Sequence, residues 1–82
     1  MSENNLQNSG QNYVEITIND QAVSIHRGRR TVEEIKIAGQ VPLNHMLEQL
    51  IDGTLTPLKD DGSIVIKGGE VFISHIKDGG SV

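Results

Sequence analysis

The feature that most restricts the fold of this chain is a regular alternation of apolar and polar residues near its start. The apolar residues of segment 13–25 include Val14, Ile16, Ile18, Val23 and Ile25. A period of two is typical of strands with one buried face, and Asn19-Asp20 between the two apolar runs favours a turn. The segment therefore predicts a β-hairpin.

A helix start follows the hairpin. Thr31 stands three residues before Glu34, the spacing of a capping box, in which each side chain bonds an otherwise unpaired backbone amide and contributes about 1 kcal/mol. The apolar positions that share one helical face are Val32, Ile35 and Ala38. Gly39 is expected to end the helix in the left-handed conformation, and Pro42 prevents its continuation. We predict a helix over 31–38, preceded by a basic loop from His26 to Arg30.

The second half of the chain predicts short strands separated by turns. The predicted strands are one that ends near Ile51, one over 54–58, a brief apolar segment at 64–66 and a last strand over 71–76. Turns are expected at Asp52-Gly53, at 60–62 and at 67–69. In the last strand, alternation places Val71 and Ile73 on one face, with Ile73 buried beside Ile16 and Ile35, and it places Phe72 and Ser74 on the outward face.

The order of these elements predicts an α+β fold. A hairpin, one helix, two short strands and a long final strand fit the β-grasp arrangement, a mixed sheet of four to five strands packed on one helix. Residues 1–12 are mostly asparagine, glutamine and serine, with too little apolar surface to offset an ordering cost of about 1–2 kcal/mol per residue. The predicted organisation is a flexible leader over 1–12, a domain over 13–78 and a tail over 79–82.

Three segments resemble the bacterial multiubiquitin family. They are HRGRRTVEEI at 26–35, LEQLIDGTLTPL at 47–58 and GGEVFISHI at 68–76, and the similarity spans about residues 13–80. The resemblance implies a ubiquitin-like protein modifier whose partners are an E1-like activating enzyme, an E2-like conjugating enzyme, a JAB-type processing metalloprotease and a target protein. Family members often hold tandem copies, whereas this chain has one, and Ser81-Val82 follow its terminal di-glycine.

The di-glycine is the candidate site of processing and conjugation, which comprises Gly79, Gly80 and Ser81. Activation by an E1-type enzyme requires a carboxylate to reach ATP and then a cysteine, and residues without Cβ let the backbone thread a narrow channel. A frayed glycine-rich end is the plainer interpretation, but the last predicted strand ends about three residues before the pair. Two further functions stay open: a β-grasp sulfur carrier, although carriers usually end at the glycine itself, and an interaction module that is never conjugated.

Composition argues against several other functions. The formal charge is −4, so attraction to nucleic acid or to an anionic membrane is not expected. Residues 1–12 hold neither a basic region nor an apolar run, and no stretch approaches the length of a membrane span, so the chain is predicted to be cytoplasmic. It has no cysteine, and its histidines, His26, His45 and His75, have no metal-ligand spacing, so neither an enzyme nor a cofactor is expected. Any basic contact must be local. The arginines Arg27, Arg29 and Arg30, together with an outward Phe72, form the possible partner surface. The plainer interpretation of the arginines is a solvated loop whose charge is balanced by Glu33 and Glu34.

Overall fold

The computed structural model describes residues 12–77. All of the predicted leader except Asn12, and the whole predicted tail, lie outside these residues. The elements in chain order are β1 (Tyr13–Ile18), β2 (Gln21–His26), β3 (Gly28–Thr31), α2 (Val32–Ala38), β4 (His45–Ile51), β5 (Thr54–Leu58), β6 (Ser63–Ile66) and β7 (Val71–Ile76).

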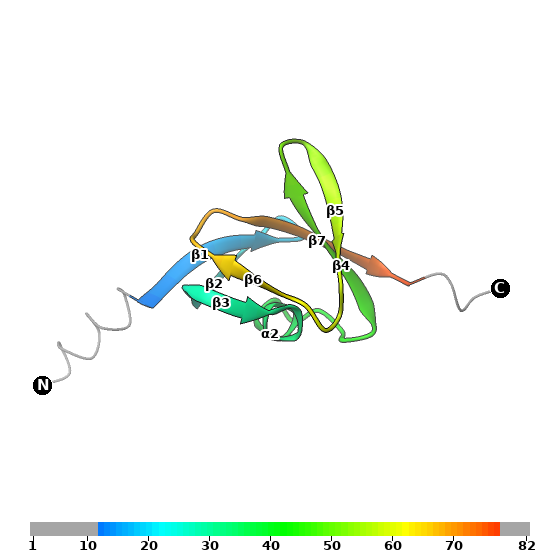
Figure 1. Cartoon of the computed structure of the whole chain (residues 1–82), viewed down its shortest axis with the longest axis horizontal. Helices are drawn as coiled ribbons and strands as arrows, with labels where there is room; N and C mark the ends of the chain where they lie inside the picture. Colours follow the sequence, from blue (N-terminus) through cyan, green and yellow to red (C-terminus); the bar gives the residue numbers. More distant parts are fainter. Residues whose placement is uncertain (1–11, 78–82) are drawn as a thin grey trace, which may run out of the picture.

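The strands form two sheets. The larger sheet has five strands in the order β2-β1-β7-β4-β5, and β3 pairs with β6 in a second sheet of two strands. β1 and β7 run parallel, whereas the other neighbours are antiparallel. Figure 1 shows α2 beneath the larger sheet, with β7 running through its middle and the β4–β5 hairpin projecting away. The predicted α+β architecture with a β-grasp sheet is confirmed.

Two tight turns set the registers of the two hairpins. Both central residues of each turn have positive φ: 53° and 69° at Asn19 and Asp20, and 51° and 80° at Asp52 and Gly53. This is the backbone of a type I′ turn, whose twist matches that of the flanking strands. Asparagine, aspartate and glycine tolerate the left-handed region best, so the sequence determines these turns locally.

The helix begins as predicted and ends differently. Thr31 Oγ1 accepts a bond from the Glu34 amide at 3.0 Å, and the Glu34 carboxylate accepts one from the Thr31 amide at 2.8 Å. The expectation of a left-handed Gly39 is wrong: its φ is −91°, and Gln40 has the positive φ of 59°. Gly39 is instead needed for space, because a Cβ there would lie 2.5 Å from Cδ1 of Ile18.

The core lies between α2 and the inner face of the larger sheet. Its buried apolar residues are Ile16, Ile18, Ile25, Val32, Ile35, Val41, Leu47, Ile66 and Phe72. The predicted faces of β7 are therefore inverted: Phe72 is fully buried and Ile73 is 38% exposed. The parallel pairing sets Phe72 beside Ile18, and neighbours in register share a face. Phe72 thus belongs to the core and cannot be part of a partner surface.

The basic loop predicted from His26 to Arg30 is largely strand. His26 ends β2, and Gly28–Thr31 pairs antiparallel with Ser63–Ile66. The pairing partner lies more than 30 residues away in the sequence, so no local pattern indicated this strand. Its consequence for function is that Arg29 and Arg30 are held on a paired strand that leads directly into α2.

Candidate functional site

The end of β7 is where the chain leaves the folded body toward the di-glycine. β7 lies between β1 and β4 in the middle of the sheet and ends at Ile76, whose side chain is 72% exposed. Figure 1 shows this end of the strand pointing away from the helix and the sheet. Gly79, Gly80 and Ser81 lie outside the described residues, so the structure describes only the base from which this predicted site extends.

A network of one carboxylate and two lysines holds that base. Lys36 of α2 is buried, and its ammonium donates to Leu43 O at 3.0 Å, to His45 O at 2.5 Å and to Asp60 Oδ1 at 2.9 Å. The other oxygen of Asp60 accepts a bond from Lys77, the residue that follows β7. Since an ammonium has three donors, Lys36 is fully satisfied. Asp60 thus links the helix to the last described residue of the chain.

The two lysines lower the pKa of the Asp60 carboxyl. The hydrogen bond from Lys77 contributes most and the bond from Lys36 comes next, while partial burial acts in the opposite direction. Both bonds are made to the charged form and so stabilise it. Asp60 is therefore a carboxylate at neutral pH, and it supplies the counter-charge that a buried ammonium requires.

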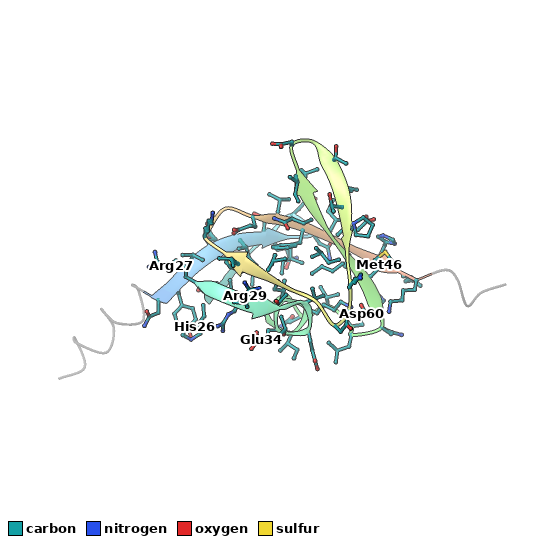
Figure 2. All side chains as sticks on the ribbon, viewed as in Figure 1. His26, Arg27, Arg29, Glu34, Met46 and Asp60 are labelled. Carbon is teal, nitrogen blue, oxygen red and sulfur yellow. The ribbon has the colours of Figure 1, made fainter. Side chains whose placement is uncertain are left out.

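An open groove of about 660 Å³ lies beside this network. Its lining includes the apolar side chains of Met46, Pro57 and Leu58, and charged residues that extend from Lys59 to Asp61 together with Lys77. Figure 2 shows Met46 and Asp60 toward the end of the molecule from which β7 leaves. The groove contains both lysines and carboxylates, so its charge does not favour one class of ligand.

The outer face of the sheet, opposite α2, carries a group of exposed apolar side chains. Leu50 of β4 faces Leu55 of β5. On the other side of β4, Ile73 of β7 lies beside Glu48. The three apolar side chains are 38–42% exposed. We call Leu50, Leu55 and Ile73 the outer apolar patch; it takes the place of the surface that had been predicted around Phe72.

The basic residues remain accessible. Arg27 and Arg29 are exposed and Arg30 is half-buried, and Arg29 donates to Ser63 Oγ at 3.0 Å. The pKa of Glu34 is lowered first by its bond from the Thr31 amide and further by the nearby charge of Arg30. No ion pair among residues 12–77 includes an arginine. Arg27 and Arg29 thus keep their charges available for a partner.

Residues 12–77 contain neither a cluster of metal-binding side chains nor a membrane-spanning helix. No group of three histidines, aspartates or glutamates there could hold a metal ion. The only histidine in an ion-pair geometry within residues 12–77 is His75, whose Nε2 lies 3.2 Å from a Glu48 oxygen. None of the helices in that part is long and apolar enough to cross a membrane.

Sequence reasoning missed the Asp60 network. The segment 60–62 was interpreted only as a turn, which it is, but a signal for its second role was present in the helix. Lys36 stands four residues after Val32 and one after Ile35, so it lies on the buried stripe of α2. A lysine at such a position needs a counter-charge, and Asp60 supplies it.

Comparisons with known proteins add nothing to this picture. No protein family, curated protein or solved structure matches the chain. The function must therefore be argued from the fold, the accessible groups and the terminal sequence.

Proposed function

We propose that this chain is a ubiquitin-like protein modifier that is cleaved after Gly80 and joined to a target through the Gly80 carboxylate. The observation that carries the proposal is the position of β7. This central strand ends at an exposed Ile76, three residues before Gly79. A short segment without bulky side chains, joined to a rigid sheet, suits entry into a narrow enzyme channel.

The chain would be the substrate of each step. A processing protease adds water across the Gly80–Ser81 peptide bond, which leaves a carboxylate on Gly80. An oxygen of that carboxylate attacks the α-phosphorus of ATP, and pyrophosphate leaves. A cysteine thiolate of the activating enzyme displaces AMP, and an amine or hydroxyl finally displaces the thiol. ATP is consumed and the catalytic groups come from partner enzymes.

The outer apolar patch is a suitable contact for the activating enzyme. Ile73 lies on β7 itself, so an enzyme bound there is close to the point from which the tail extends. Exposed apolar groups that are continuous with a reactive segment favour docking of the protein that acts on that segment. The side chain of Lys77, the residue that follows β7, is also bonded to Asp60.

If copies of this chain are joined to one another through lysines, the exposure and bonding of each lysine distinguish the candidate acceptors. The lysines are Lys36, Lys59, Lys67 and Lys77. Lys36 is 1% exposed, with its ammonium fully bonded, and Lys77 is engaged by Asp60. Lys59 and Lys67 are exposed and are the expected acceptors.

The test compares the unchanged chain with Gly80→Phe and Val82→Phe in the presence of ATP and the enzymes encoded beside its gene. Mass spectrometry follows cleavage and covalent adducts, and circular dichroism follows folding. We expect the unchanged chain and Val82→Phe to be cut after Gly80 and attached, and Gly80→Phe to fold but to remain uncut. Val82→Phe is the matched control, because it adds the same bulk beyond the cleaved bond.

Other outcomes contradict the modifier function. If Gly80→Phe is processed and conjugated as well as the unchanged chain, the enzymes do not require glycine at position 80. Replacement of a terminal oxygen by sulfur would indicate a sulfur carrier. An unchanged mass for every protein would favour an interaction module that is never conjugated.

A further inference from the structure

The two-stranded ribbon of β3 and β6 has one buried face and one exposed face. Gly28 pairs with Ile66, and Arg29 pairs with Val65. Paired residues place their side chains on the same face, and successive residues alternate between the faces. Ile66 is fully buried in the core, whereas Val65 is 47% exposed. The face that carries Arg29 and Val65 therefore points away from the core and into solvent.

Two further cations lie at one end of this ribbon. Arg27 directly precedes β3, and Lys67 directly follows β6. Because the two strands are antiparallel, both residues adjoin the same pair, Gly28–Ile66. Arg27, Arg29 and Lys67 are all exposed. We call Arg27, Arg29, Val65 and Lys67 the basic face, which combines three positive charges with one exposed apolar side chain.

The charges of the basic face are not neutralised by ion pairs. No ion pair within residues 12–77 includes Arg27, Arg29 or Lys67. Arg29 donates to the neutral Ser63 Oγ at 3.0 Å, a bond that uses one of the several N–H donors of a guanidinium. Positive charge is thus held on a paired strand while its hydrogen-bonding capacity is largely unused by residues 12–77.

The neighbouring carboxylates are bonded to the backbone instead. Glu34 accepts a bond from the Thr31 amide at 2.8 Å. The two oxygens of Glu70 accept bonds from the amides of Lys67 and Gly68 at 2.8 and 2.9 Å. These carboxylates stabilise a helix start and a turn, so the direct charge balance that the sequence suggested for the arginines is not formed within residues 12–77.

The distribution of charge favours a short acidic ligand over a long polyanion. The whole chain carries a charge of −4, so most of its surface repels an extended polyanion such as nucleic acid. Proteins that bind nucleic acid usually carry a longer basic stripe and a basic overall charge. A protein segment with a few carboxylates matches the three cations, and arginine binds carboxylates through paired hydrogen bonds. An apolar side chain in that segment would find Val65 as its contact.

We propose that the basic face binds an acidic segment of a partner protein that presents an apolar side chain between carboxylates. The carboxylates pair with the three cations, and the apolar side chain lies against Val65. Figure 1 shows β3 and β6 toward the end of the molecule where β1 begins, away from the end of β7, and Figure 2 shows Arg27 and Arg29 in the same region. The binding does not involve the di-glycine, so it goes beyond the proposed conjugation and does not depend on it.

The probe is a synthetic peptide with one leucine between two pairs of glutamates, titrated into the full chain and followed by amide NMR. We expect shifts at Arg29, Val65 and Lys67, and weaker binding as salt is raised. A peptide with lysines in place of the glutamates should not bind, and a short oligothymidine should bind more weakly than the acidic peptide. Equal binding of the two peptides, binding of the oligothymidine that equals or exceeds that of the acidic peptide, shifts confined to β2 or to the outer apolar patch, or no shifts at all would overturn the proposal.

Two sets of variants separate the contributions of charge and apolar contact. Arg27→Gln combined with Lys67→Gln removes two charges that make no ion pair within residues 12–77, so circular dichroism should show an unchanged fold while binding weakens about tenfold. Arg29→Gln should weaken binding by a similar factor. Val65→Thr replaces one methyl group by a hydroxyl at nearly the same volume and should weaken binding about threefold. If Arg29→Gln is less stable because it loses its bond to Ser63, the double variant still decides.

The matched control is Lys59→Gln, which removes one positive charge from an exposed position outside the basic face. It has the same net charge as Lys67→Gln, so a general electrostatic attraction would be reduced in both variants. We expect Lys59→Gln to bind the acidic peptide as tightly as the unchanged chain, and Lys67→Gln to bind it more weakly. Equal affinity of these two variants, or full affinity of the double variant, would show that the basic face does not hold the peptide.

Discussion

The two faces of the larger sheet both carry apolar side chains but differ in their exposure to solvent. The inner face is covered by α2, and Ile16, Leu47 and Phe72 on it are almost completely buried. On the outer face, Leu50, Leu55 and Ile73 remain 38–42% exposed. Apolar residues on strands are thus used in two ways: one set supplies folding energy, and the other remains accessible to a partner.

The contrast is sharpest within β7, where neighbouring residues belong to different faces. We expect Phe72→Ala to lower the free energy of unfolding by about 3–5 kcal/mol, because it removes a large side chain from a closely packed core. Ile73→Ala, the matched control on the same strand, should cost less than about 1 kcal/mol. Urea denaturation followed by circular dichroism measures both values.

A domain of this size has little stability to lose, so a second variant is needed where Phe72→Ala does not fold. The milder Phe72→Leu then replaces it and should still be more destabilising than Ile73→Ala. Equal costs at the two positions would contradict the assignment of the faces.

The assignment of these faces marks the limit of what the sequence could predict. Alternation established that Phe72 and Ile73 point in opposite directions, but Val71, Phe72 and Ile73 are all apolar, so the pattern did not identify the buried face. The register with Ile18, more than 50 residues away, decides it. The hairpins, the capping box and the α+β class could be predicted because turn residues and periodicity encode them locally.

Lys36 and β3 could not be placed from the local sequence, because each depends on a contact with a distant segment. A lysine suggests a solvated face, and only the approach of Asp60 from a distant turn permits its burial. β3 exists because Ser63–Ile66 pairs with it. The di-glycine motif, in contrast, was visible in the sequence as a chemical signal and lies outside the described residues.

The second test concerns Lys36, the only charged residue buried within residues 12–77, and its partner Asp60. The hydrogen bonds from Lys77 and Lys36 lower the pKa of Asp60 in the folded state. The network therefore stabilises the fold at pH values above the pKa of an unfolded aspartate, which is about 3.9. This stabilisation is lost as pH falls through the folded-state pKa. We expect the urea midpoint to decline from pH 5 toward pH 2.

Asp60→Asn isolates this contribution from those of other carboxyl groups, including Glu34. The variant leaves the buried Lys36 ammonium without its counter-charge, so it should be less stable than the unchanged chain at pH 7. The difference between the two proteins should shrink as pH is lowered. A constant difference across this range would mean that Asp60 stabilises the fold through its shape and not through its charge.

The third test loosens the helix that covers the inner face. Thr31→Ala removes the bond that its hydroxyl accepts from the Glu34 amide and should lower the free energy of unfolding by about 1 kcal/mol. Thr31→Ser keeps the hydroxyl and should restore most of the loss. If both variants lose the same amount, the methyl group of Thr31 is what matters and not the cap.

The smallest effect on stability is expected on the outer face. Leu55 is the second residue of β5, in the hairpin that projects from the sheet in Figure 1, and it is 42% exposed and faces Leu50 across the strands. Leu55→Ser removes one side of this exposed cross-strand pair and should cost about 0.5 kcal/mol or less. If the activating enzyme binds the outer apolar patch, the same change should slow formation of the thioester between Gly80 and the enzyme about tenfold, as expected when a central apolar contact is lost. Ser24→Ala, an exposed position in β2 at the opposite side of the sheet, is the control and should form the thioester at the unchanged rate. An unchanged rate for Leu55→Ser would exclude this patch as the enzyme contact, and the Lys59–Asp61 groove at the base of the tail would then be the surface to test next.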